Sequence, residues 1–203
     1  MSGTFGPDAP ELDRIAIMSG IISLSDRRAR RTRAAIVTAF NQLLFVKGYD
    51  NITPAEVTER ADVGRSTFYE HYSGKNDILA QSLAGILRPI ARAGLTAAPE
   101  PALTTVIEHF WTSRRFASAL LAGEARPVVN SLLRDMVAEE IADAQPAASI
   151  PVFLLATHLA NGHLALIEEW LTGRHGCPAP RLAETLHGIA YATLRGTPAS
   201  VSS

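Results

Sequence analysis

The side chains best suited to contacts with a ligand form one short run: Arg65, Ser66, Thr67, Tyr69 and Glu70. Arginine can donate two parallel hydrogen bonds to guanine, and hydroxyl groups suit base edges or phosphate oxygens. Five more arginines lie upstream, where they can bind phosphates with salt-dependent affinity: Arg27, Arg28, Arg30, Arg31 and Arg33. These residue types favour contact with nucleic acid, although the upstream arginines alone would equally fit a solvated helix start.

Two short helices joined by a tight turn must position this run. Thr53-Pro54-Ala55-Glu56 is a strong helix start, because Thr53 can cap the helix, Pro54 suits its first position and Glu56 can complete a capping box. We expect helices over 54–61 and 65–72, with a turn over 62–64 between them. Such a pair is a helix-turn-helix unit, whose second helix enters the major groove of DNA.

A preceding helix completes a three-helix head. Asp26 can cap a helix that runs to about Lys47, and Gly48 ends it. Apolar residues recur where the three helices must pack on one another: Val57, Ala61, Val63, Phe68 and Tyr72. The hydrogen-bonding run falls on the opposite side of the second helix of the pair, free to meet DNA.

Charge is distributed unevenly along the chain. All 203 residues together carry 19 Lys/Arg and 20 Asp/Glu, a net charge of −1. Residues 26–75 carry nine Lys/Arg and six Asp/Glu, so this segment is net +3 while the remainder is net −4. Such asymmetry hints at one part that faces nucleic acid and one that does not.

The run from Ile52 to Leu79 resembles the head of the TetR family of transcriptional regulators. Its spacing of Thr-Phe-Tyr-x-His-Tyr-x-x-Lys, over residues 67–75, is typical of that family. The resemblance implies a homodimeric DNA-binding regulator. It further implies a repressor that leaves a palindromic operator when a small-molecule effector binds its C-terminal domain.

The resemblance also implies roles for individual residues. Thr67 and Tyr69 match recognition-helix contacts, and Arg65 and Ser66 match variable base-reading positions. Gly64 stands where the family often has serine, so a cap hydroxyl is missing there, although glycine is an acceptable cap. Phosphate contacts are implied for three further residues, which with one upstream arginine complete the expected DNA-binding set: Thr53, His71, Lys75 and Arg31.

The rest of the chain also has helical periodicity, and no alternating run is long enough for a strand. Prolines and glycines mark the expected helices at 75–94, 102–113, 116–122, 127–143, 149–172 and 181–195. The predicted fold is all-α, with about nine helices in a three-helix head and a larger helical body. We assign residues 25–75 to the head, 76–195 to the body and 196–203 to a flexible tail.

Residues 1–24 are expected to form a disordered or loosely docked extension. Ile15 to Leu24 is apolar enough to resemble the core of a signal peptide, but Asp8, Glu11 and Asp13 precede it where a signal carries positive charge. No apolar stretch reaches the length of a membrane span. The one cysteine, Cys177, excludes an intrachain disulfide, which favours a reducing cytoplasm.

The last two expected helices carry leucines among small residues, a pattern that lets helices approach closely. The resemblance implies that they meet a second copy as a four-helix interface, while the alternative is a hairpin within the core of one chain. A twofold dimer would place two recognition helices in successive major grooves. The candidate interface residues are Leu159, Ala160, Leu164, Ile167, Leu182, Leu186 and Ile189.

An effector cavity within the body is implied by the resemblance alone. Its candidate lining residues are Phe110, Trp111, Arg114, Met136, His158 and Asn161. Most of the apolar ones are better explained as ordinary core. Arg114 could pair with an acidic effector, and His158 and Asn161 lie three apart on one helix, so they could point together into a cavity.

Other functions find less support in the sequence. No phosphate loop, nucleophile elbow, zinc-ligand spacing or convincing carboxylate pair is present, so we expect no catalytic residue, metal or cofactor. His158 and His163 are five apart, on different helix faces, which argues against a metal site. Cys177 has no partner cysteine for a thiol sensor. The remaining alternative is a ligand-independent dimeric DNA-binding protein.

Overall fold

The computed structural model describes residues 9–144 and 150–195, with side chains from Arg27 within those ranges. Every regular element in these ranges is helical, as predicted from the periodicity. The elements are α1 (Ala9–Lys47), η1 (Tyr49–Asn51), α2 (Pro54–Ala61), α3 (Arg65–His71), α4 (Lys75–Ala91), α5 (Pro101–Thr112), α6 (Arg114–Ala122), α7 (Arg126–Ala144), α8 (Val152–Leu171) and α9 (Ala179–Arg195).

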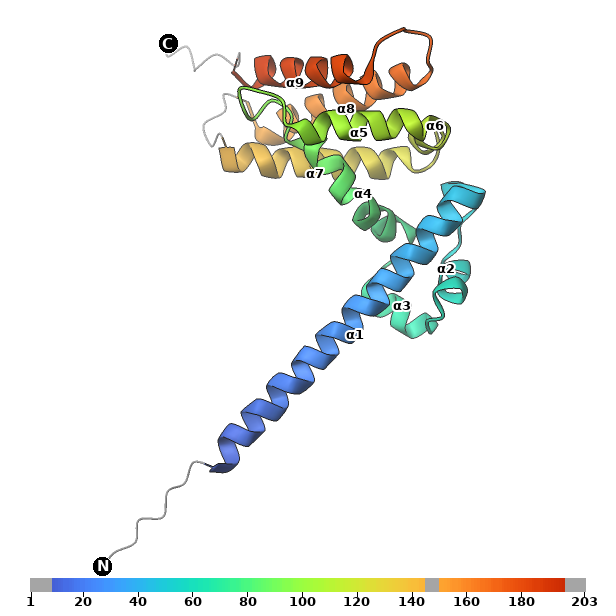
Figure 1. Cartoon of the computed structure of the whole chain (residues 1–203), viewed down its shortest axis with the longest axis vertical. Helices are drawn as coiled ribbons and strands as arrows, with labels where there is room; N and C mark the ends of the chain where they lie inside the picture. Colours follow the sequence, from blue (N-terminus) through green and yellow to red (C-terminus); the bar gives the residue numbers. More distant parts are fainter. Residues whose placement is uncertain (1–8, 145–149, 196–203) are drawn as a thin grey trace, which may run out of the picture.

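The start of α1 differs from the prediction. The helix begins at Ala9 rather than Asp26, so residues 9–24, expected to be a disordered or loosely docked extension, are helical. Pro10 suits a first helical turn, and no proline follows it within α1, so nothing in the sequence forces a break at Asp26. Figure 1 shows this N-terminal half of α1 extending away from the other helices.

The head consists of the C-terminal half of α1 with η1, α2 and α3. Its core is fully buried at Phe40, Val57 and Phe68, and Tyr72 lies beside them. Ala61 and Val63 are half-buried against the same core. The five apolar residues predicted to join these helices therefore do so, and the predicted three-helix head is confirmed.

Helix α4 belongs to both the head and the body. Its first half packs against α1 and its later residues pack against α5 and α7, so it joins the two parts in Figure 1.

Just after α4, Gly94 adopts a φ of +83°, and a Cβ there would lie 2.5 Å from the backbone nitrogen of Tyr191 in α9. Only glycine allows this approach. The Gly94 N–H also donates to His187 Nδ1 at 3.2 Å.

The body is a bundle of α5 to α9 whose core includes most of the predicted dimer residues. Six of the seven are buried within a single chain: Leu159, Ala160, Leu164, Ile167, Leu182 and Leu186. Their assignment to an interface between copies is therefore wrong. The reason is that α8 and α9 are apolar on more than one face, and these residues lie on the inner face. Ile189 alone of the seven is exposed, at 43%.

Among the described helices, none combines the length and the apolar character that a membrane crossing requires.

Candidate nucleic-acid interface

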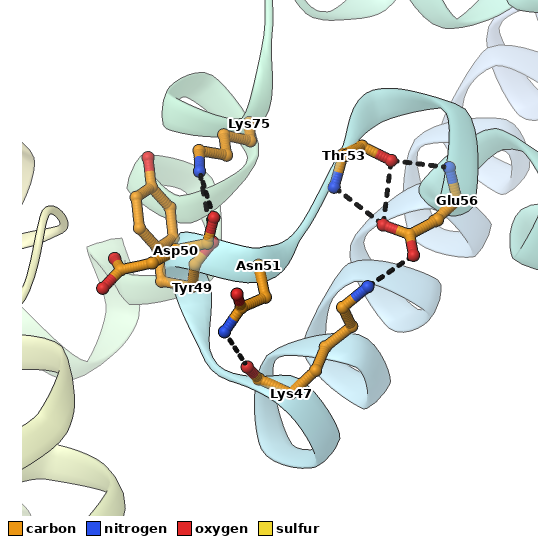
Figure 2. A network of polar contacts seen from close by, with 7 residues as sticks. All are labelled: Lys47, Tyr49, Asp50, Asn51, Thr53, Glu56 and Lys75. Carbon is orange, nitrogen blue, oxygen red and sulfur yellow. Dashed lines mark hydrogen bonds and ion pairs between the residues drawn. The ribbon is translucent and has the colours of Figure 1, made fainter.

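The start of α2 is fixed by the capping box that the sequence predicted. The backbone N–H of Thr53 donates to Glu56 Oε2 at 3.0 Å, and the Glu56 N–H donates to Thr53 Oγ1 at 3.4 Å. Lys47, at the end of α1, forms an ion pair with the same Glu56 side chain (Figure 2). The hydrogen bond from Lys47, together with those from Thr53, lowers the pKa of Glu56 from 4.5 to about 2.

A tight turn sets the angle between α2 and α3. Asp62 adopts a left-handed conformation with a φ of 53°, and the Val63 N–H donates to the Thr58 carbonyl at 3.1 Å. Gly64 occupies the cap of α3 without a side-chain hydrogen bond, as expected where serine is missing. Asparagine and aspartate adopt such conformations more readily than most residues, which explains Asp62 at this position.

The two sides of α3 differ as the sequence predicted. Phe68 is fully buried. The opposite side is exposed at Arg65, Ser66 and Glu70, and Tyr69 is 48% exposed. The Arg65 guanidinium lies 5.9 Å from the centre of the Tyr69 ring. No hydrogen bond or ion pair within the described residues engages Arg65, so its donors remain available to an external acceptor. Phe68 thus anchors a helix whose polar side is presented outward.

Three of the predicted DNA contacts come together in one groove. Thr53, Arg65 and Tyr69 line a groove of about 150 Å³, in which Thr58 and the first residues of α2 complete the wall. The start of α2 and the outer side of α3 therefore form one continuous surface. Of the other candidates, Arg31 is exposed, and Thr67 and His71 are half-buried.

Lys75 lies differently from what a phosphate contact would suggest. Its Nζ donates to the Tyr49 carbonyl at 3.2 Å and to the Asp50 carbonyl at 3.5 Å, and it lies 4.4 Å from the centre of the Tyr49 ring (Figure 2). Only 23% of the side chain is exposed. Lys75 therefore ties the start of α4 to η1. Its phosphate contact stays a prediction.

Comparison with known proteins agrees with this geometry. Residues 36–81 match the family described as bacterial regulatory proteins, tetR family. A TetR transcriptional regulator from Streptococcus agalactiae 2603V has a similar structure, with a TM-score of 0.54 and 25% identity over 83% of this chain and 98% of that one. The head of this chain, over residues 36–81, is thus that of the tetR family, and the fold of the chain resembles that of a TetR regulator.

A curated relative matches a short part of this chain. The uncharacterized HTH-type transcriptional regulator YxbF of Bacillus subtilis (strain 168) is 42% identical to this chain over 55 residues. These are 27% of this chain and 14% of that protein, so the chain matches only a small part of the length of this relative. The likeness therefore concerns about a quarter of this chain.

The TetR-family head also contacts the body through residues that sequence reasoning missed. Asp50, in η1, accepts a hydrogen bond from the Glu124 N–H in the turn between α6 and α7. Tyr49, beside it, donates its hydroxyl hydrogen to Asn76 of α4. No pattern in the sequence marks these contacts, because an exposed aspartate after a helix is ordinary in any loop.

The six predicted effector residues do not line one cavity. Met136 is buried in the core, and Phe110 is half-buried against it. His158 and Asn161 do share a face of α8, but that face is exposed, and Asn161 bonds to the carbonyl of Thr157. The prediction that they point into a cavity is wrong, because the three-residue spacing identifies a shared face and not its direction. Trp111 and Arg114 lie apart from the others, in a surface groove.

Proposed function

We propose that this chain is a dimeric transcriptional repressor that binds a palindromic operator and releases it when a small molecule binds the body. The observation that carries the proposal is the outward polar side of α3, held in place by the buried Phe68. Arg65 and Ser66 would read base edges in the major groove, while Tyr69 and Thr53 would bind the adjacent backbone.

Dimerisation would use the outer faces of α8 and α9 in place of the predicted inner ones. Leu154, Leu166 and Ile189 are exposed there, although each is large and apolar. Nothing lies within 4 Å of a Cβ placed at Gly162 or Gly188, so these glycines leave the outer faces open to a second helix pair. Burying these side chains between two copies would remove apolar surface from water and so stabilise a twofold pair.

Polar atoms in the body support an effector site within it. Buried atoms without a hydrogen-bond partner include Ser82 Oγ on α4, Asn130 Oδ1 on α7 and both ring nitrogens of His163 on α8. Buried polar atoms are normally paired, so such atoms need an explanation. A small molecule bound beside any of these atoms would supply the missing hydrogen-bond partner. Because α4 also packs on the head, a change in its position would alter the spacing of the two recognition helices.

Selection from a random double-stranded DNA library at physiological salt tests DNA reading and dimerisation together. We expect enrichment of an inverted repeat whose half-sites lie about one helical turn or a multiple of it apart. Tyr69→Ala should enrich this repeat more weakly than the parent protein. An unenriched pool for the parent protein, or a single asymmetric half-site, would contradict the proposal.

The effector part needs its own experiment. Thermal unfolding against a small-molecule library would find compounds that raise the midpoint, because a ligand that binds only the folded state stabilises it. Each such compound is then added to the complex of protein and operator. The proposal expects weaker operator binding, and stabilising compounds that all leave the operator affinity unchanged would refute ligand-controlled release.

A further inference from the structure

An open groove lies where the end of α1 meets the junction of α5 and α6. Its volume is about 350 Å³, within the usual range of small-molecule sites. Three aromatic residues and two arginines dominate its lining: Phe45, Trp111, Phe116, Arg114 and Arg115. The groove is separate from the polar side of α3 and from the buried polar atoms of the body.

The aromatic walls of this groove are exposed to solvent. Phe45 is 65% exposed and Trp111 is 39% exposed. The Phe45 ring stacks on Phe116, with ring centres 4.5 Å apart and an angle of 23° between the planes. Exposed apolar surface of this kind often marks a binding site, because leaving it in water is unfavourable. A flat apolar molecule would cover these rings.

The two arginines of the groove have no anionic partner among the described residues. Within the part of the chain that the structure describes, neither Arg114 nor Arg115 forms an ion pair or a hydrogen bond, although both are exposed. A guanidinium presents paired N–H groups that match a carboxylate, and bonds to charged groups are about twice as strong as neutral ones. The charge of the groove therefore favours an anionic ligand.

One of these arginines is already held in place. The Arg114 guanidinium lies 5.2 Å from the centre of the Trp111 ring, and a Cβ on Gly173 would lie 3.2 Å from its Nη1. Trp111 in turn packs on Trp170, with ring centres 4.8 Å apart, and Trp170 Nε1 donates to the Cys177 carbonyl at 2.7 Å. A side chain fixed in this way loses less entropy when it binds a ligand.

We propose that this groove binds an aromatic carboxylate. Its carboxylate would pair with Arg114 and Arg115, and its ring would lie against Trp111 and Phe45. An inorganic phosphate would satisfy the charges but would leave the aromatic walls exposed. Because Phe45 belongs to the head and the arginines belong to the body, an occupied groove would connect the two. Any effect on operator affinity rests on the proposed function, whereas binding itself does not.

Isothermal titration calorimetry with sodium 2-naphthoate tests the site directly, with neutral 2-naphthalenemethanol as the matched ligand. We expect R114Q/R115Q to weaken naphthoate binding by at least about tenfold, which corresponds to about 1.4 kcal/mol. F45A should weaken it by a smaller factor. The control variant R134Q/R195Q removes the same charge elsewhere and should bind naphthoate like the parent protein.

Three results would overturn the proposal: no naphthoate binding by the parent protein at millimolar concentration, equal affinity in R114Q/R115Q, or equal affinity for the neutral alcohol. Equal affinity in R114Q/R115Q would place naphthoate elsewhere in the body. The titration uses no DNA, so it tests the groove even if no operator is selected. Conversely, a failure of naphthoate binding would not affect the proposal that α3 reads DNA.

Discussion

The side-chain carboxylate of Asp50 accepts a hydrogen bond from the backbone N–H of Glu124, with 3.2 Å between oxygen and nitrogen. Asp50 lies in η1 of the head and Glu124 in the turn between α6 and α7 of the body. The bond therefore links the two parts at a point other than α4. A change in the body that moves the turn between α6 and α7 would therefore also move η1. Because η1 adjoins the start of α2, the position of α2 would change with it.

Asp50→Ala should free the Glu124 amide. Loss of the acceptor leaves that N–H to exchange with solvent, and a hydrogen bond of this kind contributes about 1 kcal/mol, so exchange should accelerate about fivefold. Hydrogen exchange measured by NMR at Glu124 checks this. Asp50→Asn keeps an acceptor oxygen and serves as the control. Unchanged exchange in Asp50→Ala would show that the bond does not hold the turn.

The ion pair between Lys47 and Glu56 gives the head a defined pH dependence. The folded-state pKa of Glu56, about 2, lies below its ordinary value of 4.5. The folded state thus favours the ionised carboxylate. This contribution is complete above about pH 4.5 and is lost as the pH falls toward 2.

Glu56→Gln should therefore lower the midpoint of thermal unfolding at pH 7 and have no such effect near pH 2. Both proteins are melted at a series of pH values, and the difference between their midpoints is plotted. Lys47→Gln should give the same dependence, because it removes the other partner. A midpoint difference that is the same at pH 7 and pH 2 would contradict the assignment.

Burial of His163 produces a second pH dependence, at higher pH. Desolvation lowers the pKa of this imidazole from 6.5 to about 4. The unfolded chain binds the proton more readily, so stability is full above about pH 6.5 and falls between pH 6.5 and 4. His163→Leu should remove most of that loss in thermal unfolding, whereas His175→Gln, at an exposed site, should not. If the unfolding midpoints of the parent protein and His163→Leu fell by the same amount between pH 6.5 and 4, the assignment of this pH dependence to His163 would be refuted.

Local signals explain which parts of the fold could be predicted. The bounds of α2 were correct because Thr53, Pro54 and Glu56 act within one helical turn, where sequence and structure are directly related. The buried Phe68 and the exposed Arg65 and Tyr69 followed from helical spacing alone. The predicted helix start at Asp26 was wrong, because a residue that is able to cap a helix can equally lie within one.

Non-local contacts explain what could not be predicted. Spacing assigned Leu164 and Leu186 to an apolar face but could not tell whether that face meets its own chain or a second copy. The Lys75 ammonium lies against the Tyr49 and Asp50 carbonyls, 26 and 25 residues earlier in the chain. Such contacts depend on how helices pack, and no motif in the sequence encodes them.

The outer face of α9 gives a test of dimerisation that leaves the protomer folded. Ile189→Glu should convert a dimer to monomers with an unchanged helical circular dichroism spectrum, because a charge buried between two copies is costly and the same charge in water is not. Leu186→Glu should instead unfold the protomer, since Leu186 is fully buried. Sedimentation equilibrium distinguishes these states, with Thr105→Glu on α5 as an exposed control. A dimer that survives Ile189→Glu would place the interface elsewhere.

The most direct test of DNA reading by α3 is a fluorescence anisotropy titration of the selected DNA with the parent protein and Tyr69→Ala at matched salt. Tyr69 is 48% exposed, so its loss should leave the helical fold intact, which a circular dichroism spectrum checks. We predict that Tyr69→Ala binds at least about tenfold more weakly, a loss of about 1.4 kcal/mol. Equal affinity of the two proteins would contradict the assignment of α3 as the recognition helix.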